Sequence, residues 1–216
     1  PIRGGSVAGG SEVQGGGSVR GGTYNWAESA GPAGYTASDW GCSGGTQDDA
    51  DTITVALGES ATCTLTNDDD GAGLTLVKQV ITNNGGLAVP ADWTLSATGP
   101  TGFSGPGPSV SNGAGFAAGT YDLSESAGPA GYTASDWVCV GGTQDDADTI
   151  TLALGESATC TISNDDELPS LILDKFVVNN NGGDAAESAW TLSAHDAPTP
   201  LSGAAPPGST NLQSHP

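Results

Sequence analysis

Two lysines are the residues of this chain best suited to covalent chemistry. Lys78 and Lys175 are its only lysines, and each ends an alternating Leu-x-Leu-x-Lys run. Residues two apart in a β-strand share a face, so each lysine is predicted to point with its leucines into a core. A buried ammonium group needs an ionic partner or a reaction. Burial also favours the neutral amine, which is a nucleophile.

Two other polar residues end apolar alternations in the same way. Glu125 ends a Tyr-x-Leu-x-Glu run, and Asn164 ends a Cys-x-Ile-x-Asn run. A lysine amine beside an asparagine carboxamide can displace ammonia, and a neighbouring glutamate can carry the proton between the two nitrogens. The fold would supply the proximity that such a reaction needs. The alternative is a structural ion pair between Lys78 and Glu125, with Asn164 as a strand-end residue.

An internal repeat organises the chain. The segment from Glu28 to Trp40 returns at 125–137, an offset of 97 residues. The same offset relates the two lysines to each other and Trp93 to Trp190. One module is therefore about 97 residues long, an ordinary domain size.

The modules are cut unevenly. Residues 71–167 form one complete module, which we call the central module. Residues 22–70 correspond to the rear part of a module, and residues 168–216 to the front part of another with a tail. Residues 1–21 form an arm rich in Gly, Ser and Val that we expect to be flexible or to be ordered by a neighbour.

The pattern of the central module predicts an all-β fold. Period-2 runs rich in Thr, Val, Ile and Tyr alternate with Gly, Pro, Asn and Asp, and no sustained helical period occurs. The Asn-Gly pairs at 84, 112 and 181 are typical of hairpin turns. Tandem immunoglobulin-like or prealbumin-like β-sandwich modules are expected. The expected strands are Leu74–Thr82, Trp93–Ala97, Thr120–Ser124, Tyr132–Val140, Thr149–Leu154 and Ala158–Ser163.

The four cysteines repeat with the module. Cys42 and Cys63 are 21 residues apart, as are Cys139 and Cys160. This spacing predicts one disulfide in each copy and an oxidising compartment. Structural zinc sites use closer cysteine pairs, and the two histidines lie only near the C-terminus.

The charge limits the partners. The net charge is −21, and four basic residues cannot form a patch for nucleic acid. The sequence contains no apolar run long enough to predict a membrane span, and we expect a secreted or surface protein whose export signal has been removed.

We expect no cofactor. Calcium is a minor alternative, because the acidic clusters match no EF-hand and are better explained as solvated turn carboxylates at 48–51, 67–70, 145–148 and 164–167.

The Lys78, Glu125 and Asn164 pattern, together with the Gly-Pro-Ala-Gly-Tyr segment after Glu125, resembles the collagen-adhesin B-type domains. These are prealbumin-like modules of bacterial surface adhesins and pilins. The resemblance implies a spontaneous isopeptide bond from Lys78 to Asn164, assisted by Glu125 as proton shuttle. Such a bond forms once per molecule, so the chain is not expected to be an enzyme.

The two ends of the chain complement each other in content. Residues 1–70 contain Glu28 and Asn67 but no lysine, whereas residues 168–216 contain Lys175 but no matching glutamate or asparagine. The front part could fold back onto the rear part of its own chain, or complete that of the next molecule and form a head-to-tail homopolymer. Lys175 would then reach Asn67, with Glu28 as the shuttle. The sequence could also be an excerpt of a longer repeat array.

Two functional classes remain open. The first is a structural extracellular filament or pilus-like fibre with strand complementation between subunits. The second is a cell-surface adhesin or stalk that binds a host or matrix ligand. The repeated aromatic residues could form its contacts, although at strand spacing they are more often core: Tyr35, Trp40, Tyr132 and Trp137. No nucleophile, zinc or phosphate motif of an enzyme is present.

Overall fold

The computed structural model describes residues 18–195 and 201–204. The described residues form short β-strands and two single-turn 3₁₀ helices, without an α-helix. The chain divides into two compact units, one made of the residues up to Ile81 and Leu87–Asp165, the other of Thr82–Gly86 and the residues from Asp166 on. The expectations for the arm at 1–21 and for the tail fall mostly outside the described residues.

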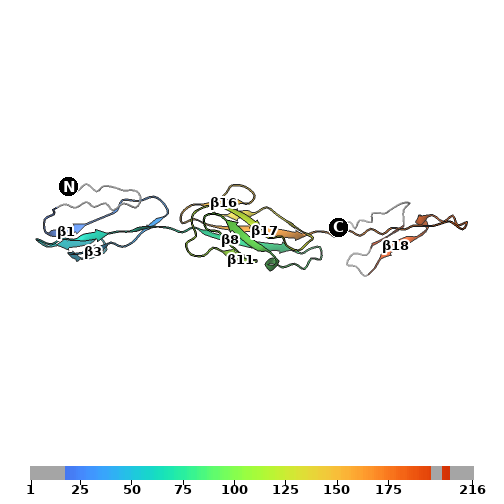
Figure 1. Ribbon diagram of the computed structural model, residues 1–216, viewed down its shortest axis with the longest axis horizontal. Coiled ribbons are helices and arrows are strands. Elements are labelled where there is room, and N and C mark those ends of the chain that lie inside the picture. Colours follow the sequence, from blue (N-terminus) through green and yellow to red (C-terminus); the bar gives the residue numbers. More distant parts are fainter. Residues whose placement is uncertain (1–17, 196–200, 205–216) are drawn as a thin grey trace. The chain divides into compact units, whose positions relative to one another are not determined.

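The central module is a sandwich of two five-stranded sheets (Figure 1). The first sheet has the order β10-β9-β12-β16-β15. Its strands are β9 (Thr94–Thr98), β10 (Phe103–Pro106), β12 (Gly119–Glu125), β15 (Thr143–Gln144) and β16 (Thr149–Leu152). The second has the order β11-β8-β17-β13, with β14 also paired to β17. Its strands are β8 (Gly73–Ile81), β11 (Ser109–Ser111), β13 (Tyr132–Ala134), β14 (Val138–Val140) and β17 (Ser157–Asp166).

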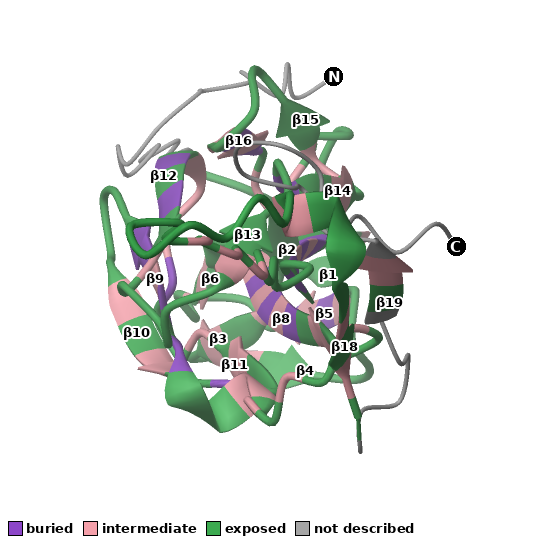
Figure 2. Ribbon diagram, turned by 90° about the vertical axis from the view of Figure 1, so that its right-hand side faces the viewer, coloured by how far each residue is buried: buried purple, intermediate pink, exposed green. Residues whose placement is uncertain are grey.

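The core lies between these two sheets. In β8, Leu74, Leu76 and Lys78 are buried and alternate with more accessible residues, which matches the expected period of two (Figure 2). In β17, every second residue from Ala158 to Asp166 is buried. The β8 and β17 strands pair in parallel over nine residues, from Ser157↔Gly73 to Asp165↔Ile81. The first and last strands of the module therefore lie side by side.

The expected fold class is confirmed, with three differences in detail. The run at 132–140 is broken into β13 and β14, and β10 and β11 were not expected because their segment is rich in Gly and Pro. The hairpin prediction was wrong for the central module. Asn84-Gly85 and Asn112-Gly113 lie in connections between strands of different sheets, so they turn the chain from one layer to the other.

The rear part contains seven short strands in three small antiparallel sheets. β1 (Gly22–Asn25) and β4 (Thr46–Gln47) flank β5 (Thr52–Val55). β2 (Tyr35–Ala37) pairs with β7 (Asn67–Asp69), and β3 (Gly41–Ser43) pairs with β6 (Thr62–Thr64). These strands correspond by the repeat to β12–β17. The rear part therefore has counterparts for the later strands of a module, and β8–β11 have none among its described residues.

The front part shows the opposite selection. β18 (Thr191–Ala194) pairs with β19 (Leu201–Ala204), which repeats the pairing of β9 with β10. The 3₁₀ turn Glu187–Ala189 repeats the turn Pro90–Asp92. Residues 171–178 correspond to β8 but form no strand, apart from an isolated bridge at Leu173. A β-strand needs a partner strand, and the last strand of a module is absent from the described front part.

Both expected disulfides are present. Cys42 pairs with Cys63, and Cys139 with Cys160, each with a Cα–Cα distance of 4.0 Å. In both copies the two cysteines are direct cross-strand neighbours. The second disulfide ties β14 to β17, the strand that also carries Asn164.

Candidate functional site: a lysine, glutamate and asparagine cluster in the central module

The structure brings Lys78, Glu125 and Asn164 together in the core. Lys78 Nζ lies 2.5 Å from Glu125 Oε2 and 2.5 Å from Asn164 Oδ1. Asn164 Nδ2 donates to the other carboxylate oxygen, Glu125 Oε1, at 2.9 Å. Lys78 is 2% exposed and Asn164 3%. The three side chains come from β8, β12 and β17, so both sheets and both ends of the module contribute to the cluster.

Burial shifts Lys78 toward its neutral form. Burial of the amine lowers the pKa of Lys78 below its ordinary value, although the hydrogen bond and charge of Glu125 act in the opposite direction. The indole of Trp93 covers the amine, with Nζ 4.6 Å from the ring centroid, and this cation–π contact also favours the charged form. Gly128 packs directly on this indole, because a Cβ there would lie 2.0 Å from Trp93 Nε1.

The two oxygens of Glu125 each contact a different nitrogen. Oε2 contacts the amine that would attack, and Oε1 contacts the amide nitrogen that would leave. A carboxyl group in this position can accept a proton at one oxygen while it donates a proton from the other. The arrangement is therefore suited to amide exchange between Lys78 and Asn164. The sequence predicted the three residues but not that Trp93 covers the amine. The recurrence of Trp93 as Trp190, at the same offset as the lysines, was the available signal.

The rear part contains two thirds of the same cluster. Asn67 Nδ2 donates to Glu28 Oε1 at 2.5 Å, which repeats the hydrogen bond from Asn164 to Glu125. Both residues are exposed, whereas Asn164 is buried. The cluster in the rear part thus has a glutamate and an asparagine in place and an open side where the central module has its lysine.

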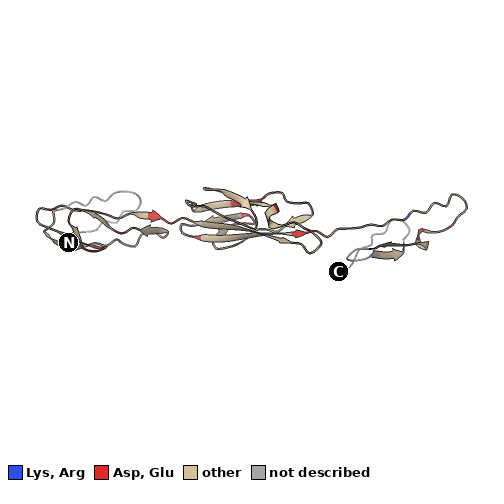
Figure 3. Ribbon diagram, turned by 90° about the horizontal axis from the view of Figure 1, so that it is seen from below, with Lys and Arg blue, Asp and Glu red and all other residues tan. Residues whose placement is uncertain are grey.

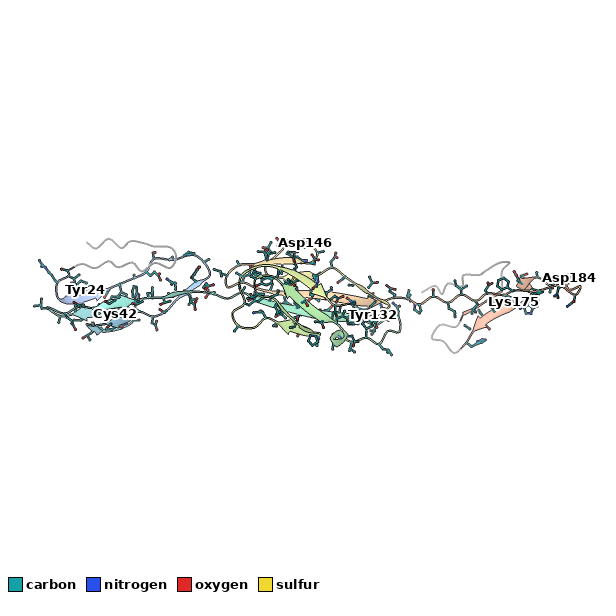
Figure 4. The ribbon with its side chains drawn as sticks, in the orientation of Figure 1. Tyr24, Cys42, Tyr132, Asp146, Lys175 and Asp184 are labelled. Carbon is teal, nitrogen blue, oxygen red and sulfur yellow. A yellow bond between two sulfur atoms is a disulfide. The ribbon has the colours of Figure 1, made fainter. Side chains whose placement is uncertain are left out.

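The front part contains the remaining third. Lys175, which is labelled in Figure 4, has its Nζ over the ring of Trp190, 4.8 Å from the ring centroid. This contact repeats the one between Lys78 and Trp93. The Lys175 amine also donates to the carbonyl of Phe176 at 3.3 Å. Lys175 belongs to the second compact unit, and Glu28 and Asn67 belong to the first.

One buried polar contact was missed from the sequence. Asp166 was expected to be a solvated turn carboxylate, and this was wrong because its side chain is 5% exposed. Its oxygens accept from the backbone amides of Asn83 at 2.8 Å, Asn84 at 3.0 Å and Gly86 at 2.6 Å. Burial alone would raise the pKa of Asp166, but these hydrogen bonds outweigh it and the pKa is lowered. Its place two residues beyond Asn164, on the buried face, was the available signal.

The other acidic turns do fit the expectation for turn carboxylates. Asp49 Oδ1 accepts from the amide of Asp51, and Asp146 Oδ1 accepts from that of Asp148, both at 3.1 Å. Figure 3 shows acidic residues on several strands and loops and few basic ones. Among the described residues, no group of three or more His, Cys, Asp or Glu side chains is placed to hold a metal ion.

The repeated aromatic residues divide between core and surface. Trp137 is buried, and Tyr132 packs edge-on against Trp93 and accepts a hydrogen bond from the amide of Ala88 at 3.0 Å. In the rear part Trp40 is only half-buried and Tyr35 is exposed. The same residue types are therefore covered in the central module and uncovered in the rear part.

Comparison with known proteins gives the family. The family of prealbumin-like fold domains matches residues 1–65, 69–162 and 166–215. The chain belongs to this family. Its three matched segments follow the repeat, and the resemblance to prealbumin-like adhesin and pilin modules is confirmed. No curated protein matches the chain.

The solved structures that are similar to this chain share little sequence with it. A major pilin from Streptococcus pyogenes is 12% identical, with a TM-score of 0.35 over 69% of this chain and 72% of the pilin. A second major pilin from that species is 17% identical, with a TM-score of 0.34 over 65% of each chain. These similarities are too low to assign a role to any residue of this chain. No helix among the described residues has the length and apolar character needed to cross a membrane.

Proposed function

We propose that this chain is an extracellular structural protein, the subunit of a head-to-tail filament at a bacterial cell surface. The front part of one copy completes the rear part of the next, and Lys175 forms an isopeptide bond with Asn67. The observation that carries the proposal is the hydrogen bond between Asn67 and Glu28, a copy of the central cluster without its lysine. The two disulfides fit an oxidising, extracellular location.

The exposure of equivalent residues supports the exchange of parts. Leu74 is 1% exposed in the central module, whereas its counterpart Leu171 is 50% exposed. Trp93 is 1% exposed and its counterpart Trp190 is 39% exposed. Residues that bury their side chains against the later strands of a module are thus uncovered in the front part. Burial of such apolar surface is the main driving force for association.

The surface of the rear part supports the same exchange. A Cβ at Gly128 would clash with Trp93, but a Cβ at its counterpart Gly31 meets no atom within 4 Å. The space that an indole fills in the central module is therefore open beside Gly31. The counterparts of β17 are β6 and β7, and among the described residues neither has a parallel partner such as β8 is to β17. Trp190 and residues 171–178 of a second copy have the matching side chains and length.

The chemistry is the same in both clusters. In the central module, the Lys78 ammonium gives one proton to Glu125, which leaves a neutral amine and a carboxylic acid. Nζ attacks Asn164 Cγ, and the Nζ–Cγ bond forms. Nζ then loses a proton to one oxygen of Glu125 while the other oxygen protonates Nδ2. The Cγ–Nδ2 bond breaks, ammonia leaves, and Glu125 ends as it was before the attack. Pre-positioning by the fold supplies most of the acceleration.

The proposal predicts a covalent dimer from two variants that cannot polymerise. An Asn67→Ala chain keeps its lysine and serves as the donor; a Lys175→Ala chain keeps Asn67 and Glu28 and serves as the acceptor. Each alone should remain a monomer in a denaturing gel, and their mixture should give one dimer band and no higher band. A mixture without the dimer would refute the cross-link between copies. That result would favour a front part that completes the rear part of its own chain, or terminal parts that are completed by further repeats of a longer array.

A further inference from the structure

In the central module an aspartate binds a loop. The rear part of the chain contains the counterpart of this aspartate, and the front part contains the counterpart of the loop. Asp166 binds the amides of the loop 83–86. Its counterpart by the repeat is Asp69, at the end of β7. The counterpart of the loop is 180–183, and both loops have the sequence Asn-Asn-Gly-Gly. The residues on both sides of the contact are therefore the same in type.

The loop at 180–183 shares a left-handed glycine with its counterpart in the central module. Gly182 has φ +88°, close to the φ of +99° at Gly85, its counterpart. Such positive values favour glycine, and they turn the neighbouring amides of the loop toward one point. Residues 180–183 are exposed, whereas the loop of the central module is occupied by Asp166.

The carboxylate of Asp69 is available for such a contact. It is exposed, and within the described part of the chain no hydrogen bond or ion pair involves its side chain. Its neighbour Asp70, by contrast, accepts a hydrogen bond from Thr36 at 2.7 Å. Asp69 has the spacing from Asn67 that Asp166 has from Asn164, so a copy that delivers Lys175 to Asn67 also delivers its loop to Asp69.

We infer that Asp69 of one copy binds the backbone amides of residues 180–183 of the next copy, as a non-covalent clamp that fixes the register of the junction before the isopeptide bond forms. This inference rests on the proposed function. A strand shifted by one residue would turn Lys175 to the wrong face, and a strand shifted by two would move its amine away from Asn67. Only one register places both the carboxylate on its loop and the lysine beside its asparagine.

The test measures the rate of dimer formation with the Asn67→Ala donor, as the concentration of the Lys175→Ala acceptor is varied. Adding Asp69→Ala to the acceptor should raise the half-saturating concentration about ten- to hundredfold, the expected loss for hydrogen bonds to a charged group. The plateau rate should stay roughly unchanged, because the reacting groups are intact. The matched control is Asp68→Ala, which removes an exposed carboxylate of the same strand and should leave both quantities unchanged.

The loop side of the clamp gives an independent check. Gly182→Val in the donor forces a β-branched residue into a left-handed conformation and should weaken docking in the same way. With Asp69→Ala in the acceptor as well, the two losses should not add, because they remove one contact. Additive losses would overturn the clamp, as would a fall in the plateau rate alone or an Asp69→Ala acceptor that behaves like Asp68→Ala. Absence of any dimer with the unaltered acceptor would overturn the proposed function as well.

Discussion

Lys78 and Asn164 lie on adjacent parallel strands, with Lys78 Nζ 2.5 Å from Asn164 Oδ1 in the core of the sandwich. The direct register partner of Lys78 is Ile162, so Asn164 lies two residues farther along the same face. Since β8 and β17 are the first and last strands of the module, a bond between these residues would join its two ends. A pulling force along the chain would then pass through a covalent link between neighbouring strands.

Glu125 should be required for this bond in the central module. Glu125→Gln keeps the shape of the side chain but cannot relay a proton, so cross-linking should slow by about 10²-fold or more. Intact mass under denaturing conditions reports it, because each bond removes one ammonia. Asp122→Asn is the matched control, since Asp122 is an exposed carboxylate on the same strand. Equal cross-linking in both variants would contradict a role for Glu125.

The buried lysine should make stability depend on alkaline pH in a chain that lacks the bond. Asn164→Ala prevents the bond and leaves Lys78 with a lowered pKa in the folded state. Between that pKa and the unfolded value of 10.5, the unfolded chain binds more protons, so the free energy of unfolding should rise with pH. Denaturant titrations at several pH values measure this rise.

The control for the pH experiment is the double variant Lys78→Met and Asn164→Ala. It has no amine at this position, so its stability should not show the added rise in the same pH window. If the free energy of unfolding depends on pH in the same way in the two proteins, the amine of Lys78 titrates in the folded state as it does in water.

The indole that covers the lysine gives a prediction about two equivalent glycines. Gly128→Ala places a Cβ against Trp93 and should destabilise the central module by about 1–3 kcal/mol, as overpacking does. Gly31→Ala meets open space in a single chain and should leave its unfolding unchanged. In the mixture of donor and acceptor, however, Gly31→Ala in the acceptor should slow dimer formation, because Trp190 would occupy that space. An acceptor with Gly31→Ala that reacts at the normal rate would contradict the proposed seating of Trp190.

Asp166 should stabilise the central module through its loop. Asp166→Ala leaves the amides of Asn83, Asn84 and Gly86 without their acceptor, at a cost of roughly 1–3 kcal/mol for each amide that stays buried. Asp165→Ala removes an exposed carboxylate beside it and should change the stability little. Thermal unfolding of the two variants makes the comparison. Similar melting temperatures would mean that water replaces the carboxylate without loss.

Much of the central cluster could be predicted because it follows from strand periodicity. The alternation predicted that the side chains of Lys78, Glu125 and Asn164 point into the core. The recurrence of a lysine at the same position of the repeat indicated that its placement is not accidental. The contact of Asp166 was missed because its partners are backbone amides, which leave no side-chain pattern. β10 and β11 were missed because Gly and Pro weaken the strand signal, although pairing with β9 and β8 holds both segments in the sheets.

The terminal parts show why periodicity alone was not enough. Residues 171–178 have the same alternation as β8, with Leu171, Leu173 and Lys175 in the same places, yet they form no strand. Backbone hydrogen bonds of a strand come from a neighbour, and local sequence cannot supply one. The alternation therefore indicates which segment can form a β-strand, and only the structure shows whether a neighbouring strand is present to pair with it.

The central claim is that Lys175 of one copy bonds to Asn67 of another. Its most direct measurement is tandem mass spectrometry of protease digests from the wild-type protein, with the multimers and the monomer cut separately from a denaturing gel. We predict a branched peptide in the multimers that joins Lys175 Nζ to Asn67 Cγ with the loss of one ammonia, together with the Lys78–Asn164 peptide. If the Lys175–Asn67 peptide occurs only in the monomer band, or if multimers form without it, the account is contradicted.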